Sequence, residues 1–176
     1  MVNIMDIKEC RFCGNKELDI IKRFKDCPLS GQFIKEKQNI KYEKIYPLTL
    51  LYCYQCNTCL IKEIIPSQYL FENIMESSYF YYSSAIKQLV IHFKELYETI
   101  KIKYPTKKIL EIGCNDGVFI NNFIDQDYNI IGVDPSKTIL NITNKNIITY
   151  HDYFNDNIVV DIINMGIKIL LYVVIV

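Results

Sequence analysis

The chain has 176 residues, enough for one ordinary domain or for a small domain joined to a larger one. Half of the residues are hydrophobic, so an apolar core can form, and 20 basic and 20 acidic residues give a formal net charge of zero. This balance creates no field that would attract nucleic acid or an anionic membrane, so neither is expected as a partner.

The N-terminal stretch "MVNIMDIKECRFC" contains no apolar run like that of a signal peptide. The longest uninterrupted apolar run, "ILLYVVIV" at residues 169–176, is far shorter than the ~18 residues that span a bilayer. We therefore expect a soluble, cytoplasmic protein. Thiols stay reduced in that compartment, so the seven cysteines are expected to bind metal or to pack in a core.

Residues 1–66 are predicted to form a small, loop-rich zinc-binding module. They show no sustained helical periodicity, they contain six of the seven cysteines, and their short runs such as "KIYPLTLLYC" favour β-strands. A module of this size has a thin core, which a structural metal would supplement.

Two Cys-x-x-Cys pairs supply the thiolates of a possible tetrahedral zinc site: Cys10 with Cys13, and Cys53 with Cys56. Because Cys59 forms a second, overlapping pair with Cys56, the spacing alone leaves the choice open. Buried cysteines without metal are the alternative interpretation. A site with four cysteine ligands has no open coordination position, so the zinc would be structural.

Residues 67–105 are predicted to be a linking helical segment. An amphipathic helix is expected from Ser83 or Ser84, either of which can cap it, to the "KYPTKK" stretch. Its apolar positions follow the helical spacing, and they are Ile86, Leu89, Val90, Phe93, Leu96, Tyr97 and Ile100. His92 lies among these positions and is expected to be structural.

Residues 106–176 alternate between predicted strands and predicted helices. The strands are expected at 107–113, 128–134, 146–154 and, in the apolar tail, 167–176, with helices at 117–125 and 136–143. This alternation is typical of parallel βαβ units. The expected fold class is therefore α/β: a small zinc-binding domain followed by a truncated, Rossmann-like domain.

A turn rich in glycine follows the first strand of that domain, in "ILEIGCNDGVF". The candidate ligand-binding residues of this turn are Glu111, Gly113, Asn115, Asp116 and Gly117. Asp134 ends the next strand, where a carboxylate can accept hydrogen bonds from ribose hydroxyls. Together these features predict a nucleoside-binding unit.

The spacing of the turn argues against a dinucleotide. The G-x-G-x-x-G pattern of NAD-dependent enzymes is absent, because Gly113 and Gly117 lie four residues apart with no glycine between them. Glu111 would also repel phosphate, whereas an acid suits a cationic ligand without phosphates. S-adenosylmethionine (SAM) has these properties, and an NAD-dependent enzyme is the rival interpretation.

Four stretches, in order, resemble the N-terminal portion of the zinc-binding, SAM-dependent sugar C-methyltransferases. They are "CRFCG"; "CPLSGQFI" with "YPLTLLYCYQC"; "YFYYSS" before the predicted helix; and "LEIGCNDGVFI" through "GVDPS". Members of this family join a small zinc-binding domain, a methyltransferase domain and a further C-terminal domain. They methylate nucleotide-linked keto-deoxysugars through an enolate.

The resemblance implies roles for individual residues. Its register places Cys53 and Cys56 beside Cys10 and Cys13 as the zinc ligands, with Cys27 and Cys59 at positions that are ordinarily apolar. It also implies that Tyr79 and Tyr81 face the active site, where a phenol can hydrogen-bond an enolate oxygen, and that Ser84 lines the cofactor pocket. Plain aromatic packing is the alternative for the two tyrosines. Cys114 would be a spare thiol, and His151 would lie at the surface or at the rim of the pocket.

Members of the family are longer than this chain, and the segments that supply an active-site histidine and a Glu-His pair have no counterpart here. We therefore expect a truncated or frameshifted fragment that binds SAM weakly and turns over nothing. The alternative is a non-catalytic remnant that binds zinc or a nucleoside, or an interaction module. The sequence does not indicate an oligomeric state.

Overall fold

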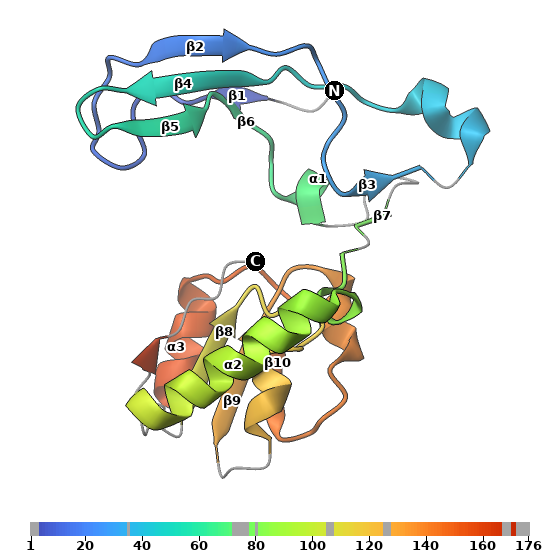
Figure 1. Cartoon of the computed structure of the whole chain (residues 1–176), viewed down its shortest axis with the longest axis vertical. Helices are drawn as coiled ribbons and strands as arrows, with labels where there is room; N and C mark the ends of the chain where they lie inside the picture. Colours follow the sequence, from blue (N-terminus) through green and yellow to red (C-terminus); the bar gives the residue numbers. More distant parts are fainter. Residues whose placement is uncertain are drawn as a thin grey trace. The chain divides into compact units, whose positions relative to one another are not determined.

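The computed structural model describes residues 4–34, 36–71, 78–79, 81–104, 108–124, 128–166 and 170–171. Contacts divide the chain into two compact units, Met1–Phe80 and Tyr81–Val176 (Figure 1). This division falls within the predicted linking segment 67–105. No helix among the described residues is long and apolar enough to cross a membrane.

The N-terminal unit is built from short strands. They are β1 (Met5–Asp6), β2 (Asp19–Arg23), β3 (Gln32–Phe33), β4 (Thr49–Cys53), β5 (Thr58–Ile61), β6 (Glu63–Ile64) and β7 (Ser78–Tyr79), with a 3₁₀ helix η1 (Lys37–Tyr42) and one helical turn α1 (Gln68–Phe71). The largest sheet is antiparallel with the order β2-β4-β5, while β1 pairs with β6 and β3 with β7.

The described core of this unit is small and contains sulfur. Cys10, Cys53 and Leu60 are buried together, and partly buried apolar or cysteine side chains surround them: Ile7, Cys13, Leu18 and Cys56. Side chains alternate between the two faces of a strand, so alternate positions of β4 (Thr49, Leu51 and Cys53) are buried. The pleat of β4 thus directs Cys53 into the core.

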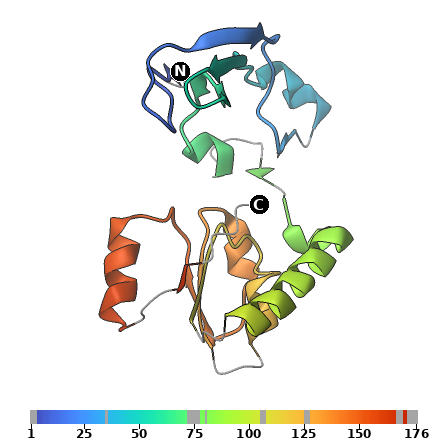
Figure 2. The same cartoon turned by 60° about the vertical axis from the view of Figure 1, so that its left-hand side comes forward.

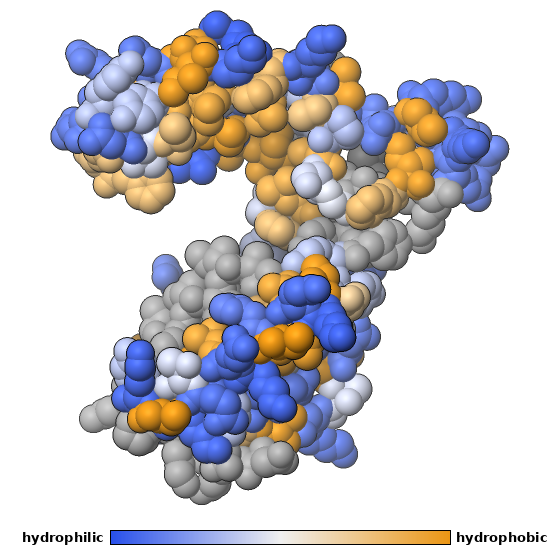
Figure 3. Space-filling model, in the orientation of Figure 1, coloured by the Kyte–Doolittle hydropathy of each residue, from blue (hydrophilic) through white to orange (hydrophobic). Residues whose placement is uncertain are grey.

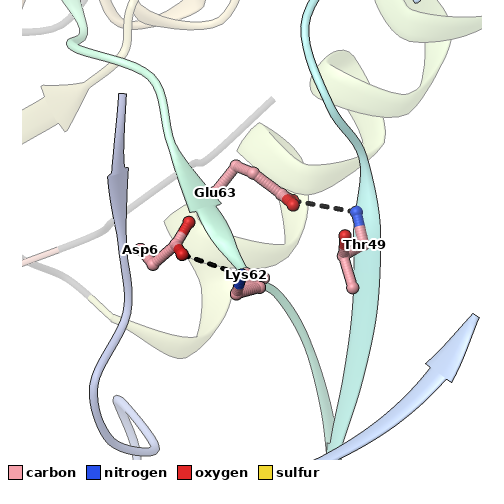
Figure 4. Close-up of polar contacts among 4 residues, drawn as sticks. All are labelled: Asp6, Thr49, Lys62 and Glu63. Carbon is pink, nitrogen blue, oxygen red and sulfur yellow. Dashed lines mark hydrogen bonds and ion pairs between the residues drawn. The ribbon is translucent and has the colours of Figure 1, made fainter. Parts of the chain in front are cut away.

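A buried carboxylate holds the join between β5 and β6 against the start of β4 (Figure 4). Glu63 accepts a hydrogen bond from the backbone N–H of Thr49 at 2.8 Å, and the backbone N–H of Lys62 donates to the Thr49 carbonyl at 3.0 Å. Lys62 also forms an ion pair with Asp6, at 2.7 Å between Nζ and Oδ2. These bonds connect the small β1-β6 pair to the main sheet of the unit.

Strand β2 is exposed along its whole length, and among the described residues it pairs with β4 alone. Ile20 and Ile21 are 42% and 54% exposed, and they lie at an irregularity of the pairing with β4, where the register shifts between Ile20 and Lys22. Figure 3 shows hydrophobic side chains, in orange, at the surface of this unit in the region of β2.

The C-terminal unit is built around a parallel sheet. Its elements are η2 (Ser83–Ala85), α2 (Lys87–Lys103), β8 (Lys108–Ile112), η3 (Ile120–Phe123), β9 (Asn129–Val133), η4 (Lys137–Asn141), β10 (Ile147–Tyr150), α3 (Asp156–Asn164) and β11 (Leu170–Leu171). The strand order is β10-β9-β8-β11, and every neighbouring pair is parallel. The α/β class predicted from the sequence is therefore confirmed.

Helices cover both faces of this sheet, with α2 on one side and α3 on the other (Figure 2). Alternate residues of β9 face the two layers: Ile130 packs in the cluster that contains Phe93 of α2, and Ile131 in the cluster that contains Ile162 of α3. Strands buried on both faces are characteristic of parallel sheets.

The α2 layer is rich in aromatic rings. Tyr97 meets Phe123 edge to face with ring centroids 4.8 Å apart, and Phe119 meets Phe123 at 5.3 Å. Burial of each such side chain stabilises the unit by about 1.5–3 kcal/mol.

The two helices predicted between the strands are shorter than expected. In the described parts of the segments predicted to be helical, 117–124 and 136–143, the structure has the short 3₁₀ helices η3 and η4 instead of α-helices. In η3, the Asn122 side chain donates to the carbonyls of Val118 and Phe119 at 3.0 and 2.9 Å. Such bonds compete with the backbone bonds of a regular α-helix.

Helix α3 was not predicted. It begins at Asn155, whose side chain accepts a hydrogen bond from the backbone N–H of Ile158 at 3.1 Å and so caps the helix. The predicted strand 146–154 correspondingly ends at Tyr150. Of the predicted tail strand 167–176, only β11 lies within the described residues.

We expect replacement of Gly117 by alanine to destabilise the C-terminal unit by about 2–4 kcal/mol. Gly117 has a φ of +79°, and a Cβ atom there would lie 2.8 Å from Cγ1 of Ile142. Gly166→Ala is the matched control, because Gly166 has a φ of +70° but no atom within 4 Å of the added Cβ. It should cost only about 1–2 kcal/mol. Urea unfolding measures both, and equal losses would show that Ile142 does not oppose the added methyl group.

Candidate functional site

The four predicted zinc ligands come together in the N-terminal unit. The sulfur atoms of Cys10, Cys13, Cys53 and Cys56 all lie within 4.8 Å of one another. The shortest separations join Cys10 to Cys56, at 3.5 Å, and Cys13 to Cys53, at 3.6 Å. Four sulfurs at this spacing form the donor set of a closed, structural zinc site.

The remaining cysteines lie outside this cluster. Cys59 is exposed on β5, Cys114 is buried in the C-terminal unit, and Cys27 forms an isolated backbone bridge with Tyr46. The overlapping pair that Cys59 forms with Cys56 in the sequence is therefore not the pair used.

Both cysteine pairs end in the same backbone conformation. The residue after the second cysteine of each pair has a positive φ: Gly14 at +74° and Asn57 at +55°. Glycine and asparagine are the residues that adopt this region most readily. In the first pair, the backbone N–H of Gly14 also bonds to the Cys10 carbonyl at 2.9 Å. The sequence C-x-x-C-[GN] thus encodes the turn that brings each pair of sulfurs together.

The cysteines of the cluster differ in pKa. A backbone hydrogen bond from Asn15 acts to lower the pKa of Cys13, but burial and the neighbouring thiols outweigh it and raise this pKa to about 12. Burial opposes ionisation of Cys53, but the backbone N–H of Cys56 and the Asn15 side chain outweigh it and lower the pKa of Cys53 to about 6. The Asn15 amide nitrogen donates to the Cys53 sulfur at 3.6 Å, whereas the Cys56 thiol donates to Thr58 Oγ1 at 3.3 Å. Sequence reasoning did not identify Asn15 or Thr58, although each follows a Cys-x-x-Cys pair by two residues.

The predicted ligand turn of the C-terminal unit lies at the point where the order of strands in the parallel sheet changes direction. From β8 the chain proceeds through β9 to β10 on one side, whereas β11 pairs on the other side of β8. Open parallel sheets bind ligands at the carboxyl ends of the strands beside such a switch point. The turn 113–117 follows β8 directly, and Asp134 follows β9, so both lie at this edge.

Asp134 binds protein donors with both of its oxygens. Oδ2 accepts from the backbone N–H of Asn115 at 2.8 Å, and Oδ1 accepts from the backbone N–H and the hydroxyl of Ser136. A carboxylate has about four acceptor positions, so about one remains for a ribose hydroxyl. Sequence reasoning missed Ser136, although an Asp-x-Ser turn is a known local hydrogen-bonding pattern.

The side chains of Asn115 and Asp116 bind the chain that precedes α2. Asn115 accepts from the backbone N–H of Ser83 at 3.0 Å and donates to the Tyr81 carbonyl at 2.9 Å. Oδ2 of Asp116 accepts from both the backbone N–H, at 3.2 Å, and the hydroxyl of Ser84. Ser84 therefore contacts the turn through hydrogen bonds to a carboxylate, and its place in a cofactor pocket remains a prediction.

Glu111 is the most deeply buried acid of this region, with 2% of its surface exposed. Burial raises the pKa of Glu111 well above its usual value. A backbone hydrogen bond from Ile120 lowers this pKa in part, and the negative charges of Asp134 and Asp116 raise it further. Oε2 of Glu111 and Oδ1 of Asp116 are buried and have no hydrogen-bond partner. Unpartnered buried carboxylate oxygens favour a cationic or donor-bearing ligand.

The predicted tyrosines are only partly described. The backbone of Tyr79 pairs with Gln32, and its side chain lies outside the described residues. Tyr81 is partly buried, and its carbonyl is held by Asn115. His92 on α2 and His151 after β10 are both exposed. The catalytic assignment of the two tyrosines remains a prediction.

Comparison with known proteins agrees with this arrangement. Residues 10–71, which include all four clustered cysteines, match the family described as "Putative zinc binding domain". The C-methyltransferase NovU of Streptomyces niveus is 24% identical over 145 residues, which are 80% of this chain and 33% of that protein. The chain thus spans about a third of the length of this curated relative.

These findings confirm the resemblance stated from the sequence. Residues 10–71 match a zinc-binding domain, and the chain is similar to part of a C-methyltransferase. Its cysteine cluster has the ligands of a zinc site.

Proposed function

We propose that the C-terminal unit is a Rossmann-like domain that binds SAM and belongs to a C-methyltransferase. The observation that carries this proposal is the group of buried carboxylates at the switch point. Glu111, Asp116 and Asp134 are 2%, 9% and 7% exposed, and the first two have oxygens without a partner. SAM carries a sulfonium and an ammonium group, either of which would complement this negative charge.

The same carboxylates disfavour a dinucleotide. Two phosphates beside the buried Glu111 would meet a negative or proton-bearing group instead of the backbone donors of a glycine-rich turn. Of the two turn glycines, Gly117 is tightly packed, because a Cβ there would meet Ile142. These features favour SAM over NAD.

In this proposal the two units have different tasks. The sulfonium of bound SAM would supply an electrophilic methyl group, and the protein would hold and orient it. Glu111 and Asp116 provide charge complementarity, and Asp134 fixes the ligand turn through the backbone of Asn115. Zinc bound by the four cysteines would stabilise the N-terminal unit, because a site with four cysteine ligands is closed to substrate.

The substrate is proposed by analogy with the family: a nucleotide-linked keto-deoxysugar that reacts as its enolate. Tyr79 and Tyr81 are the proposed partners of the enolate oxygen. The chain spans 33% of the length of its curated relative. Turnover of the sugar is therefore proposed for a full-length protein of this kind and not for this chain alone. The cytoplasmic location likewise remains a prediction.

Calorimetric titration of the zinc-loaded chain with three ligands tests the cofactor proposal. SAM and S-adenosylhomocysteine should bind at one site per chain, with SAM the tighter because only it carries the sulfonium charge. NAD should not bind. Tighter binding of NAD would overturn the proposal. Binding of none of the three, in a chain that retains zinc, would favour the non-catalytic zinc module instead.

A further inference from the structure

Asn115 connects three parts of the C-terminal unit that are far apart in the sequence. Its backbone N–H donates to Asp134 after β9, and its side chain reaches back 34 and 32 residues to Tyr81 and Ser83. The residue is 6% exposed. Both the amide oxygen and the amide nitrogen of its side chain thus form a hydrogen bond within the protein.

The side-chain amide acts on the 81–84 segment as a neighbouring strand would. Its oxygen accepts from the N–H of Ser83 and its nitrogen donates to the carbonyl of Tyr81, on either side of Tyr82. Asp116 extends the contact by one residue, to the N–H and hydroxyl of Ser84. The segment where the chain enters this unit is therefore fastened at successive positions to the ligand turn.

The backbone of Asn115 is suited to this task. Its φ is +50°, a left-handed conformation that asparagine tolerates better than most residues do. This conformation accompanies the hydrogen bond from its N–H to Asp134 and the side-chain bonds to 81–84. Glycine would tolerate the same φ but would supply no amide.

We propose that Asn115 is a positioning residue that fastens the 81–84 segment to the ligand turn, so that ligand binding and order of this segment favour each other. The attachment of the 81–84 segment to the turn is inferred from the hydrogen bonds of Asn115 alone. The effect of a ligand on this segment rests on the proposed function. A ligand that stabilises the turn would stabilise the segment bound to it, and by linkage the fastened segment would raise the affinity of the turn.

Amide hydrogen exchange of the full chain, followed by NMR, tests the fastening. Asn115→Gly keeps the favoured backbone conformation and removes the amide. The Ser83 N–H should then exchange about tenfold faster or more, while the amides of β9 change little. Asn144→Gly is the matched control, since it removes an asparagine acceptor that binds the backbone N–H of Asn146 in the same unit. It should leave Ser83 unaffected.

S-adenosylhomocysteine tests the coupling. It should slow exchange at Ser83 in the unsubstituted chain, and its affinity should fall about tenfold in Asn115→Gly. Unchanged exchange at Ser83, or an increase equal to that of the β9 amides, would overturn the fastening. Equal affinity of both forms would overturn the coupling. If S-adenosylhomocysteine binds neither the unsubstituted chain nor Asn115→Gly, the proposed function is refuted. The exchange rates of the Ser83 N–H in the two chains without ligand would still show whether Asn115 holds the 81–84 segment.

Discussion

Replacing Cys56 with alanine is expected to remove zinc and to unfold the N-terminal unit. Only five hydrophobic residues are buried among the described residues of this unit, and two of them, Cys10 and Cys53, belong to the cluster. Structural zinc contributes roughly 10–16 kcal/mol to folding in zinc-finger peptides, which exceeds what so small a core can supply. Elemental analysis should find the zinc content falling from about one per chain to near zero. Circular dichroism should show the loss of strand structure.

Cys59→Ala provides the matched control. It removes a thiol three residues further along the chain, on the exposed side of β5 and outside the cluster. This variant should keep its zinc and its thermal stability. Retention of zinc by Cys56→Ala, or its loss from Cys59→Ala, would contradict the assignment of ligands.

Replacing Glu111 with glutamine is expected to abolish a pH dependence that the unsubstituted chain shows. Because the pKa of folded Glu111 is raised above its usual value of 4.5, the folded chain binds more protons than the unfolded chain above that pH. The free energy of unfolding should therefore decrease as pH rises from 4.5 through the raised pKa. Glutamine carries no titrating proton, so urea unfolding of Glu111→Gln should lack this decrease.

The same substitution should weaken SAM binding. A cation favours the ionised carboxylate, so affinity for SAM should increase with pH over the window in which Glu111 loses its proton. Removing one charge-assisted contact costs about 1.5–3 kcal/mol, which corresponds to a loss of affinity of roughly tenfold to a hundredfold. Asp161→Asn, an exposed acid on α3, is the control and should keep both the affinity and its pH dependence. An unchanged pH profile in Glu111→Gln would exclude Glu111 from the site.

Features encoded by local spacing were predicted well from the sequence. The two Cys-x-x-Cys pairs fold into turns that depend on Gly14 and Asn57 next to them. Spacing alone left Cys59 as an alternative partner of Cys56, and the resemblance to the family selected the four cysteines whose sulfurs cluster. The strands β8 and β9 were equally visible, because strands buried on both faces are rich in apolar residues. Strand β10 was also predicted, although Ile148 and Thr149 are exposed and the strand ends at Tyr150.

Features that depend on distant partners were not predicted. Helix α3 consists largely of isoleucine and valine, which favour strands, and packing of Ile158 and Ile162 on the sheet overrides that preference. The hydrogen bonds of Asn115 to residues 32 and 34 positions earlier follow no local rule. Burial of Glu111 similarly depends on how the η3 segment folds over the end of β8.

The exposed strand β2 carries a risk of aggregation. Within the described part of the chain one edge of β2 has no neighbouring strand, and with two exposed isoleucines it offers another chain a place to add a strand. Lys22, Arg23 and Lys25 lie along the same stretch and are exposed. A second copy of this strand, paired in parallel register, would bring its own positive charges against these, and the repulsion would disfavour self-association through β2.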